Sequence, residues 1–321
     1  MGLQEVLLVV AFGFAVACGL NDGAAVLAAG LRVRGITPWV AVVALGAAVV
    51  VAPLVLGTAV ATTLASDLVS FDGEGGRRAL LVAVATATGV TALLTKRGLP
   101  TSLTLALIGA LTGAGLGAGF DVSVGTVGFV LLMGVLAPLV GLAGGWMLTV
   151  AVAGAPSSSP LRRRVPRWHL AGFGLQCLAY GANDGQKMLA VVAVAVGSTA
   201  SSGGAVEVPV PSLLLLGALF MVGTVLGLGS VGATLAGGVA PIQPAAAVIT
   251  EVSSATVVLG SSAIGAPVSM TQAISGAMVG TEVQGGHGRI RWQQVARLAV
   301  AWVLTLPAAL AVAAGVAAVW A

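Results

Sequence analysis

Long apolar stretches separated by short polar segments dominate this chain. They fall at about residues 3–30, 38–64, 79–95, 99–117, 125–152, 170–197, 211–235, 243–264, 267–281 and 296–320. Hydrophobic and polar residues do not alternate within them, as they do in the strands of a membrane barrel, so the pattern predicts helices. Most stretches reach the roughly 20 residues that a helix needs to cross a bilayer. The short stretch at 267–281 predicts a half-helix or one arm of a hairpin.

Composition identifies the environment of these helices. Hydrophobic residues make up 58% of the chain and charged residues only 7%, and the mean hydropathy is +1.09. Ordinary soluble domains carry about one-quarter charged residues, so the chain is expected to be an integral membrane protein. The 47 glycines favour close packing between helices and local unwinding. Basic residues are confined to short segments between apolar stretches, so the net charge of +4 does not predict a nucleic-acid partner.

The distribution of charge predicts two halves of opposite orientation. If the loop that holds Arg162–Arg164 and Arg167 is cytoplasmic, eleven of the fourteen basic residues follow the positive-inside rule. The expected organisation is a first repeat of about five segments at 1–154, a cytoplasmic linker at 155–168 and a second repeat at 169–321. An odd number of crossings in each half puts both termini outside and inverts the halves. Inverted repeats are typical of secondary transporters, which makes a multi-pass plasma-membrane location the expectation.

One short polar signature occurs in both halves. The first copy is Gly19-Leu20-Asn21-Asp22-Gly23 and the second is Gly181-Ala182-Asn183-Asp184-Gly185, so Asn183 follows Asn21 by 162 residues. An intramembrane carboxylate is costly, and by default it indicates a functional site. Two copies predict a duplicated fold with one paired site.

A second paired signature follows the first one at a similar interval. Pro100-Thr101-Ser102-Leu103-Thr104 lies in the first half, and Pro267-Val268-Ser269-Met270-Thr271 lies in the second half. Proline with nearby hydroxyl side chains is typical of a helix start, with proline in the first turn. Such a start directs free N–H groups and the positive end of the helix dipole at what lies ahead, which favours an anion.

These groups together suit the symport of an oxyanion with a cation. Ser102, Thr104, Ser269 and Thr271 would donate to a phosphate-like ion, whereas Asp22 and Asp184 would repel it. A bound Na⁺ or H⁺ at each aspartate removes that repulsion, so cation binding becomes a condition for anion binding. The membrane potential adds a need for cations, since moving a negative charge inward costs about 2.3 kcal/mol per 100 mV.

Nearly the whole chain resembles the PiT family of inorganic phosphate transporters. The resemblance rests on both Asn-Asp signatures, Gln186-Lys187, both proline-hydroxyl elements, Thr250–Ala255, Ile274–Gly280 and Ala301–Ala309. It implies an all-α fold of two inverted repeats with broken or re-entrant helices at the centre, and a Na⁺- or H⁺-coupled phosphate symporter that works by alternating access.

The resemblance also assigns expected roles to residues of this chain. By position, Asn21 and Asn183 would join the phosphate site with the four hydroxyl residues, and Thr101 and Gln186 would assist. Asp22, Asp184 and Glu251 would take the coupling cation, and the two aspartates would bind Na⁺ if sodium is used. The expected partners are phosphate or sulfate, the cation and the lipid bilayer, with no resident cofactor and no enzymatic activity. A homodimer stays an open option.

Several points remain open from the sequence. Lys187 could pair with an acid, attract phosphate or reach the interface, and His169 and His287, beside loops, are expected to be solvated. The chain departs from the hydroxyl and histidine residues common in the family at four positions: Leu103, Leu105, Met270 and Gln272. A proton-coupled sulfate permease is therefore the main alternative. A passive anion channel and an intramembrane aspartyl protease are weaker ones.

Overall fold

Helices account for nearly all of the ordered architecture. A computed structural model describes residues 2–31, 33–96, 101–153, 159–197, 206, 208–229, 243–285 and 290–321. In the first half the helices are α1 (Leu3–Cys18), α2 (Ala24–Gly30), α3 (Pro38–Leu56), α4 (Ala59–Thr62), α5 (Gly73–Lys96), α6 (Leu103–Gly117) and α7 (Val124–Ala153). In the second half they are α8 (Ser159–Tyr180), α9 (Gln186–Val196), α10 (Val210–Gly227), α12 (Pro244–Ala263), α13 (Met270–Glu282) and α14 (Trp292–Trp320).

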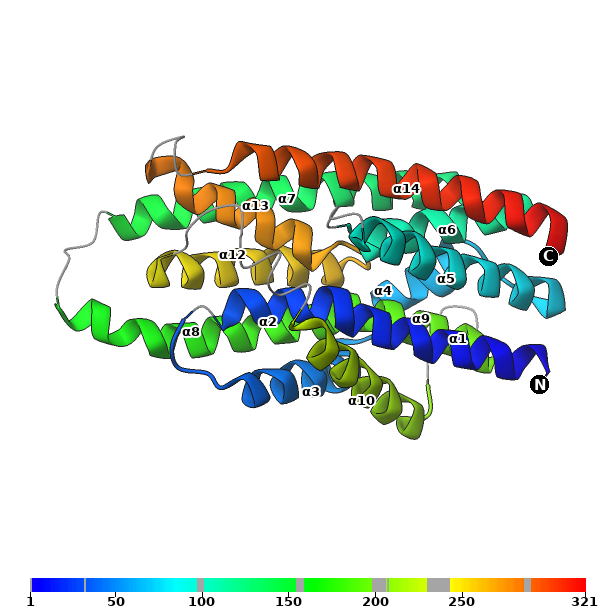
Figure 1. Ribbon diagram of the computed structural model, residues 1–321, viewed down its shortest axis with the longest axis horizontal. Coiled ribbons are helices and arrows are strands. Elements are labelled where there is room, and N and C mark those ends of the chain that lie inside the picture. Colours follow the sequence, from blue (N-terminus) through cyan, green and yellow to red (C-terminus); the bar gives the residue numbers. More distant parts are fainter. Residues whose placement is uncertain are drawn as a thin grey trace.

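The two halves repeat one order of elements in opposite directions. The N-terminal end of α1 and the C-terminal end of α14 lie at one end of the elongated bundle, whereas α7 ends and α8 begins at the other (Figure 1). The pair α1–α2 therefore runs away from the termini, and its counterpart α8–α9 runs towards them. This arrangement confirms the predicted all-α fold of two inverted repeats.

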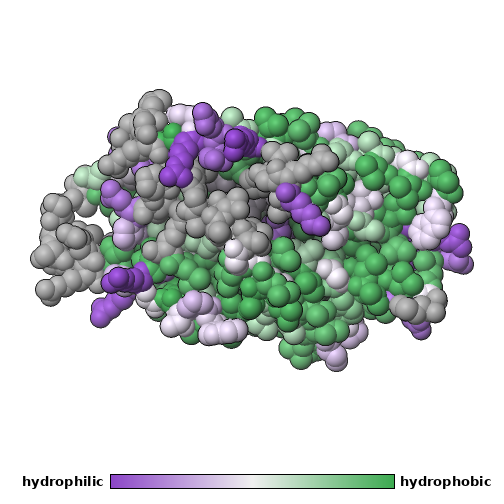
Figure 2. All heavy atoms as spheres, viewed as in Figure 1, coloured by the Kyte–Doolittle hydropathy of each residue, from purple (hydrophilic) through white to green (hydrophobic). Residues whose placement is uncertain are grey.

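The outer helices have the length and surface of membrane-spanning segments. Among the described residues, seven helical segments are long and apolar enough to cross a bilayer. Large apolar side chains point outward on α7 and α14, with Val124 82% and Val303 73% exposed. On the face shown in Figure 2, apolar side chains cover most of the described surface, and hydrophilic ones form separate groups, some at the ends and some nearer the middle. A lipid environment explains why these apolar side chains can remain uncovered.

Two central helices are too short to cross. α6 has 15 residues and α13 has 13. A helix of that length extends about 20 Å, against about 30 Å for the hydrocarbon core. α13 confirms the half-helix predicted at 267–281, and α6 is its counterpart in the first half. Each short helix begins inside the protein, where its first N–H groups need partners.

Each short helix packs along the last helix of the opposite half. α6 lies against α14, and α13 lies against α7. Glycines allow this approach: a Cβ on Gly109, Gly113 or Gly117 would overlap carbonyl oxygens of α14, and one on Gly276 or Gly280 would overlap those of α7. Small residues bring membrane helices into such close contact. The two halves are therefore interlocked, and the α6 and α13 starts are held at the centre.

α8 begins at Ser159, inside the segment predicted to be a linker, and it includes Pro166. Two local expectations were wrong. Pro267 lies before the α13 N-cap, Ser269, rather than in the first helical turn. His169 is 0% exposed rather than solvated, because α8 extends past the apolar stretch and buries it against α12. Pro100, His287 and residues 155–158 of the predicted linker lie outside the described residues.

Candidate functional site

Both Asn-Asp signatures form a widened helical turn. Gly19–Gly23 (η1) joins α1 to α2, and Gly181–Gly185 (η3) joins α8 to α9, each as a π-helical segment in a continuous helix. A π-turn shifts the backbone hydrogen bonds by one residue, and such bulges occur frequently at functional sites. Asn21, Asp22, Asn183 and Asp184 are all at least 92% buried.

Each widened turn packs against a helix from the other half. A Cβ on Gly19 would overlap the carbonyl oxygen of Phe220 on α10. A Cβ on Gly181 would overlap the carbonyl oxygen of Ala48 on α3. The glycines that bracket the signatures therefore allow backbone contact between the halves, and the same device is used twice.

In the second half, Lys187 forms the polar centre with Asp184. Its Nζ atom lies 2.7 Å from Asp184 Oδ1 and 2.7 Å from the Thr104 hydroxyl, and it also donates to the Val268 carbonyl oxygen. Lys187 is only 2% exposed. The Met270 N–H, at the start of α13, also lies close to the Asp184 carboxylate. The ammonium thus connects η3, the α6 start and the segment before α13.

The second oxygen of Asp184 is differently placed. Oδ2 is buried and has no hydrogen-bond partner among the described residues. A buried acceptor without a donor is costly, and it indicates a position where a donor or a cation can add.

In the first half, Asp22 has no ammonium partner. Its Oδ1 accepts a 2.8 Å hydrogen bond from the side-chain amide of Asn21. No Lys, Arg or His side chain in the described part of the chain forms an ion pair with Asp22. Asp22 lies near enough to Asp184 and Lys187 to interact electrostatically with both. The two aspartates therefore belong to one centre and differ in how their charge is balanced.

Asn183 fixes the backbone that precedes α13. Its Nδ2 donates to Ser262 Oγ at 3.0 Å and to the Ala266 carbonyl oxygen at 2.9 Å, and its Oδ1 accepts from the Val268 N–H at 3.0 Å. A longer contact of 3.4 Å reaches Ser261 Oγ. These bonds satisfy polar groups of a buried, non-helical segment, so Asn183 positions the α13 start.

The starts of α6 and α13 have nearly the same backbone geometry. Ser102 is the N-cap of α6 with φ −96° and ψ 112°, and Ser269 is the N-cap of α13 with φ −99° and ψ 121°. Ser102 Oγ accepts from the Leu105 N–H at 3.3 Å. Ser269 Oγ instead lies 2.8 Å from the Thr271 hydroxyl.

The two starts also meet each other. The Thr104 hydroxyl lies 3.5 Å from the Val268 carbonyl oxygen, across the boundary between the halves. The hydroxyl of Thr101 is buried without a hydrogen-bond partner in the described part of the protein. Both helix starts thus bring hydroxyl groups and N–H groups to the centre that contains the aspartates.

Gln186 stabilises a break in the first half. Its Nε2 donates to the Gly57 carbonyl oxygen at 2.8 Å, and its Oε1 accepts from the Ala61 N–H at 3.0 Å. Gly57 follows α3 with φ +83°, a conformation that favours glycine. The side chain of Gln186 therefore bonds to the backbone at the start of α4, away from the contacts of Lys187.

Glu251 lies apart from the aspartates, at the end of a polar row between α8 and α12. Its Oε2 lies 3.1 Å from Nδ1 of His169, and Gln176 Nε2 donates to Ser254 Oγ at 3.1 Å one step further along. The row ends at Asn183 with Ser261 and Ser262. Ten residues separate Glu251 from Ser261, or about 15 Å along a helix.

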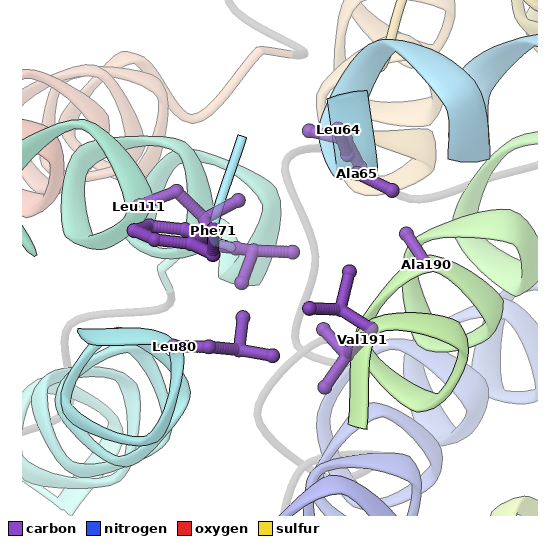
Figure 3. A pocket seen from close by; sticks show the side chains of 9 residues that line it. Leu64, Ala65, Phe71, Leu80, Leu111, Ala190 and Val191 are labelled. Atoms are coloured by element: carbon purple, nitrogen blue, oxygen red, sulfur yellow. The ribbon is translucent and has the colours of Figure 1, made fainter. Parts of the chain in front are cut away.

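A small cavity lies beside the centre but cannot hold an oxyanion. It has a volume of about 10 Å³ and is lined by apolar side chains, among them Leu107, Leu111 and Val191 (Figure 3). An apolar lining offers no donors to a charged ligand. Val191 is one turn beyond Lys187 and Leu107 is one turn beyond Thr104, so dry packing borders the centre on this side.

The structure brings most of the expected site residues together. Asp22, Asp184, Lys187, Thr104 and the α13 start share one buried centre, with Asn21 and Asn183 attached to it. Glu251 and Gln186 are held elsewhere. Sequence reasoning missed His169 as a buried partner of Glu251, although its seven-residue spacing to Gln176 and again to Asn183 was a signal that one face of α8 is polar.

Known proteins resemble this chain over most of its length. The phosphate transporter family matches residues 18–170 and 167–313. A protein of Mycobacterium bovis named as a probable low-affinity inorganic phosphate transporter is 32% identical over 96% of this chain and 75% of its own length. A Bacillus subtilis protein of the same name is 25% identical over 95% of this chain and 93% of its own length.

In the described residues, no cluster of three His, Cys, Asp or Glu side chains could hold a metal ion.

A solved structure has the same fold. It is titled the sodium-dependent phosphate transporter, and it aligns with a TM-score of 0.83 over 99% of both chains at 22% identity. The matched family and the matched relatives are transporters rather than enzymes.

Proposed function

Because this chain belongs to the phosphate transporter family, we propose that it is a cation-coupled symporter that carries inorganic phosphate into the cell by alternating access. The phosphate site is formed by the starts of α6 and α13, with donors from Ser102, Thr104, Ser269 and Thr271 and help from Asn21, Asn183 and Thr101. Asp22, Asp184 and Glu251 form the coupling system. Gln186 supports it by stabilising the break after α3.

One observation carries this proposal. Two short helices from opposite halves begin at the same buried centre, and that centre also holds two carboxylates and one ammonium. Helix starts offer free N–H groups and a positive dipole end to an anion. The carboxylates would oppose an anion unless a cation balances them, so the arrangement makes cation binding a requirement for phosphate binding.

The free oxygen of Asp184 favours phosphate over sulfate. Hydrogen phosphate carries an O–H group at neutral pH, whereas sulfate does not. Asp184 Oδ2 is buried and has no donor among the described residues, so it can accept a hydrogen bond from that O–H group. Sulfate would leave the acceptor unsatisfied, which costs about 1–3 kcal/mol. A sulfate permease thus remains the second candidate.

The two inverted repeats support the proposal of alternating access. The apolar packing around Leu107 and Val191 borders the centre on one side, and the polar row from His169 to Asn183 approaches it from the other. Rocking of one repeat against the other would open the buried centre on one side of the membrane and close it on the other. We propose a plasma-membrane location with both termini outside. Na⁺ is the first coupling ion to test, because the solved relative is titled sodium-dependent.

Uptake into proteoliposomes tests this function. Labelled phosphate and labelled sulfate are offered separately, with a Na⁺ gradient or a pH gradient imposed one at a time. We expect phosphate to accumulate against its gradient under one of the two, and we expect both Asp22→Asn and Asp184→Asn to lose accumulation, each measured on purified protein that has been shown to be folded. Accumulation that is unchanged in both variants, or phosphate movement that only ever equilibrates, would contradict symport.

A further inference from the structure

Lys187 has no equivalent in the first half. Counted from the two aspartates, Lys187 stands three residues after Asp184, and Ala25 stands three residues after Asp22. Both positions are buried, in the helix that follows the widened turn. The duplicated centre is therefore symmetric in its carboxylates and asymmetric in its fixed positive charge.

The contacts of the Lys187 ammonium resemble those of a bound cation. A carboxylate, a hydroxyl and a backbone carbonyl oxygen surround Nζ. Carboxylates and unwound backbone carbonyls are the groups that hold Na⁺ in transporter sites. An ammonium has three N–H donors, and each of these three oxygens can take one. No donor of Lys187 is then left for phosphate.

The charge balance differs between the aspartates. The ammonium offsets the charge of Asp184, and an uncompensated buried charge at either residue would cost several kcal/mol. In the described part of the chain, Asp22 accepts a hydrogen bond from the Asn21 amide and forms no ion pair, although it lies near enough to Asp184 and Lys187 to interact electrostatically with both. With both carboxyl groups ionised, the three groups Asp22, Asp184 and Lys187 carry one net negative charge, and Lys187 forms its ion pair with Asp184 rather than with Asp22.

We infer that Lys187 is a tethered cation that takes the place of one co-transported cation at Asp184, so that the transported cation loads at Asp22. This inference rests on the proposed symport and narrows it. It assigns Lys187 to cation selectivity and stoichiometry rather than to phosphate binding. A chain with an uncharged residue at position 187 would need one more external cation for each phosphate bound.

Linkage between phosphate binding and cation concentration tests the inference. Binding of labelled phosphate to the purified full-length protein is measured while Na⁺ is varied at constant pH, and again while pH is varied without Na⁺. The slope of log affinity against log cation concentration counts the cations that bind with phosphate. All variants are measured in the same buffers, so protonation of phosphate itself contributes equally to every slope and cancels in the comparison.

Three variants give distinct expected slopes. For Lys187→Met we expect a slope steeper than wild type by about one, so each tenfold dilution of the cation weakens binding about tenfold more. Lys187→Arg keeps the charge and should keep the wild-type slope. The double variant Asp184→Asn/Lys187→Met removes both charges, and it should also keep the wild-type slope.

The outcomes separate this inference from the proposed function. A wild-type slope in Lys187→Met, or a double variant whose slope is lower than wild type by about one, would overturn the tethered cation. The double variant decides alone if Lys187→Met does not fold, because it removes both members of the buried ion pair and leaves neither of them without its partner. A wild-type protein whose phosphate binding ignores both cations would instead overturn the symport proposal.

Discussion

The two Asn-Asp signatures share a backbone and differ in chemistry. Both are widened turns whose glycines contact a helix of the opposite half. Around Asp184, however, the Lys187 ammonium forms an ion pair with the carboxylate, and Asn183 accepts a hydrogen bond from the segment before α13. Asp22 accepts a hydrogen bond from Asn21 and has no ion-pair partner among the described residues. Duplication thus explains the shared backbone geometry of the two signatures. Divergence of a few side chains explains how the two cation sites can differ.

The same contrast extends along the neighbouring helices. Counted from the two asparagines, His169 corresponds to Leu7 and Gln176 to Phe14. Counted from Pro267 and Pro100, Glu251 corresponds to Val84. The interface of α8 with α12 is therefore polar where that of α1 with α5 is apolar. Buried polar residues are costly and usually have a function, so the polar row between α8 and α12 is a candidate for a role that the first half does not share.

The largest expected effect on folding comes from breaking the Asp184 pair. Asp184→Asn leaves the Lys187 ammonium buried without its counter-charge, and removing one partner of such a pair costs about 3–5 kcal/mol. Asp22→Asn removes no ion pair and should cost no stability. Thermal unfolding of purified protein, at a fixed scan rate and in one detergent, compares the two. Equal losses of stability in the two variants would contradict a difference in charge balance between the two signatures.

A smaller effect is expected at the polar row. His169→Leu leaves Glu251 without its partner, and an unsatisfied buried group costs about 1–3 kcal/mol, limited because a carboxylate can take up a proton. The double variant His169→Leu/Glu251→Val copies the apolar pairing of the first half and should recover that stability. Unfolding temperatures measure the rescue. If Glu251 belongs to the coupling system, uptake stays impaired in the stable double variant, whereas full uptake would remove Glu251 from it.

Much of this architecture could be predicted from the sequence. Apolar stretches gave the helices, and the repeated signatures and charge distribution gave two inverted halves. The short stretch at 267–281 correctly indicated the half-helix α13. These features depend on hydrophobicity and on local order, which are visible in one sequence.

Other features depend on contacts between distant segments. The π-turns at η1 and η3 form where glycines meet α10 and α3, and no local pattern records those partners. Lys187 could be given several roles until Thr104 and Val268, from two other segments, were found around its ammonium. His169 was expected to be solvated because it lies beside a predicted loop, yet helix α8 buries it against α12. Tertiary packing decides each of these cases.

Phosphate binding to Asp22→Asn tests the central claim, that a cation must neutralise Asp22 before phosphate can bind. Labelled phosphate is equilibrated with wild type and with the variant, first with the coupling cation present and then with it withheld. Na⁺ is withheld by replacing it with a bulky organic cation, and H⁺ is withheld by raising the pH. We predict that wild type binds phosphate only with the cation and that Asp22→Asn, which carries no charge there, binds it in both conditions. An Asp22→Asn protein that requires the cation as strongly as wild type would contradict the account.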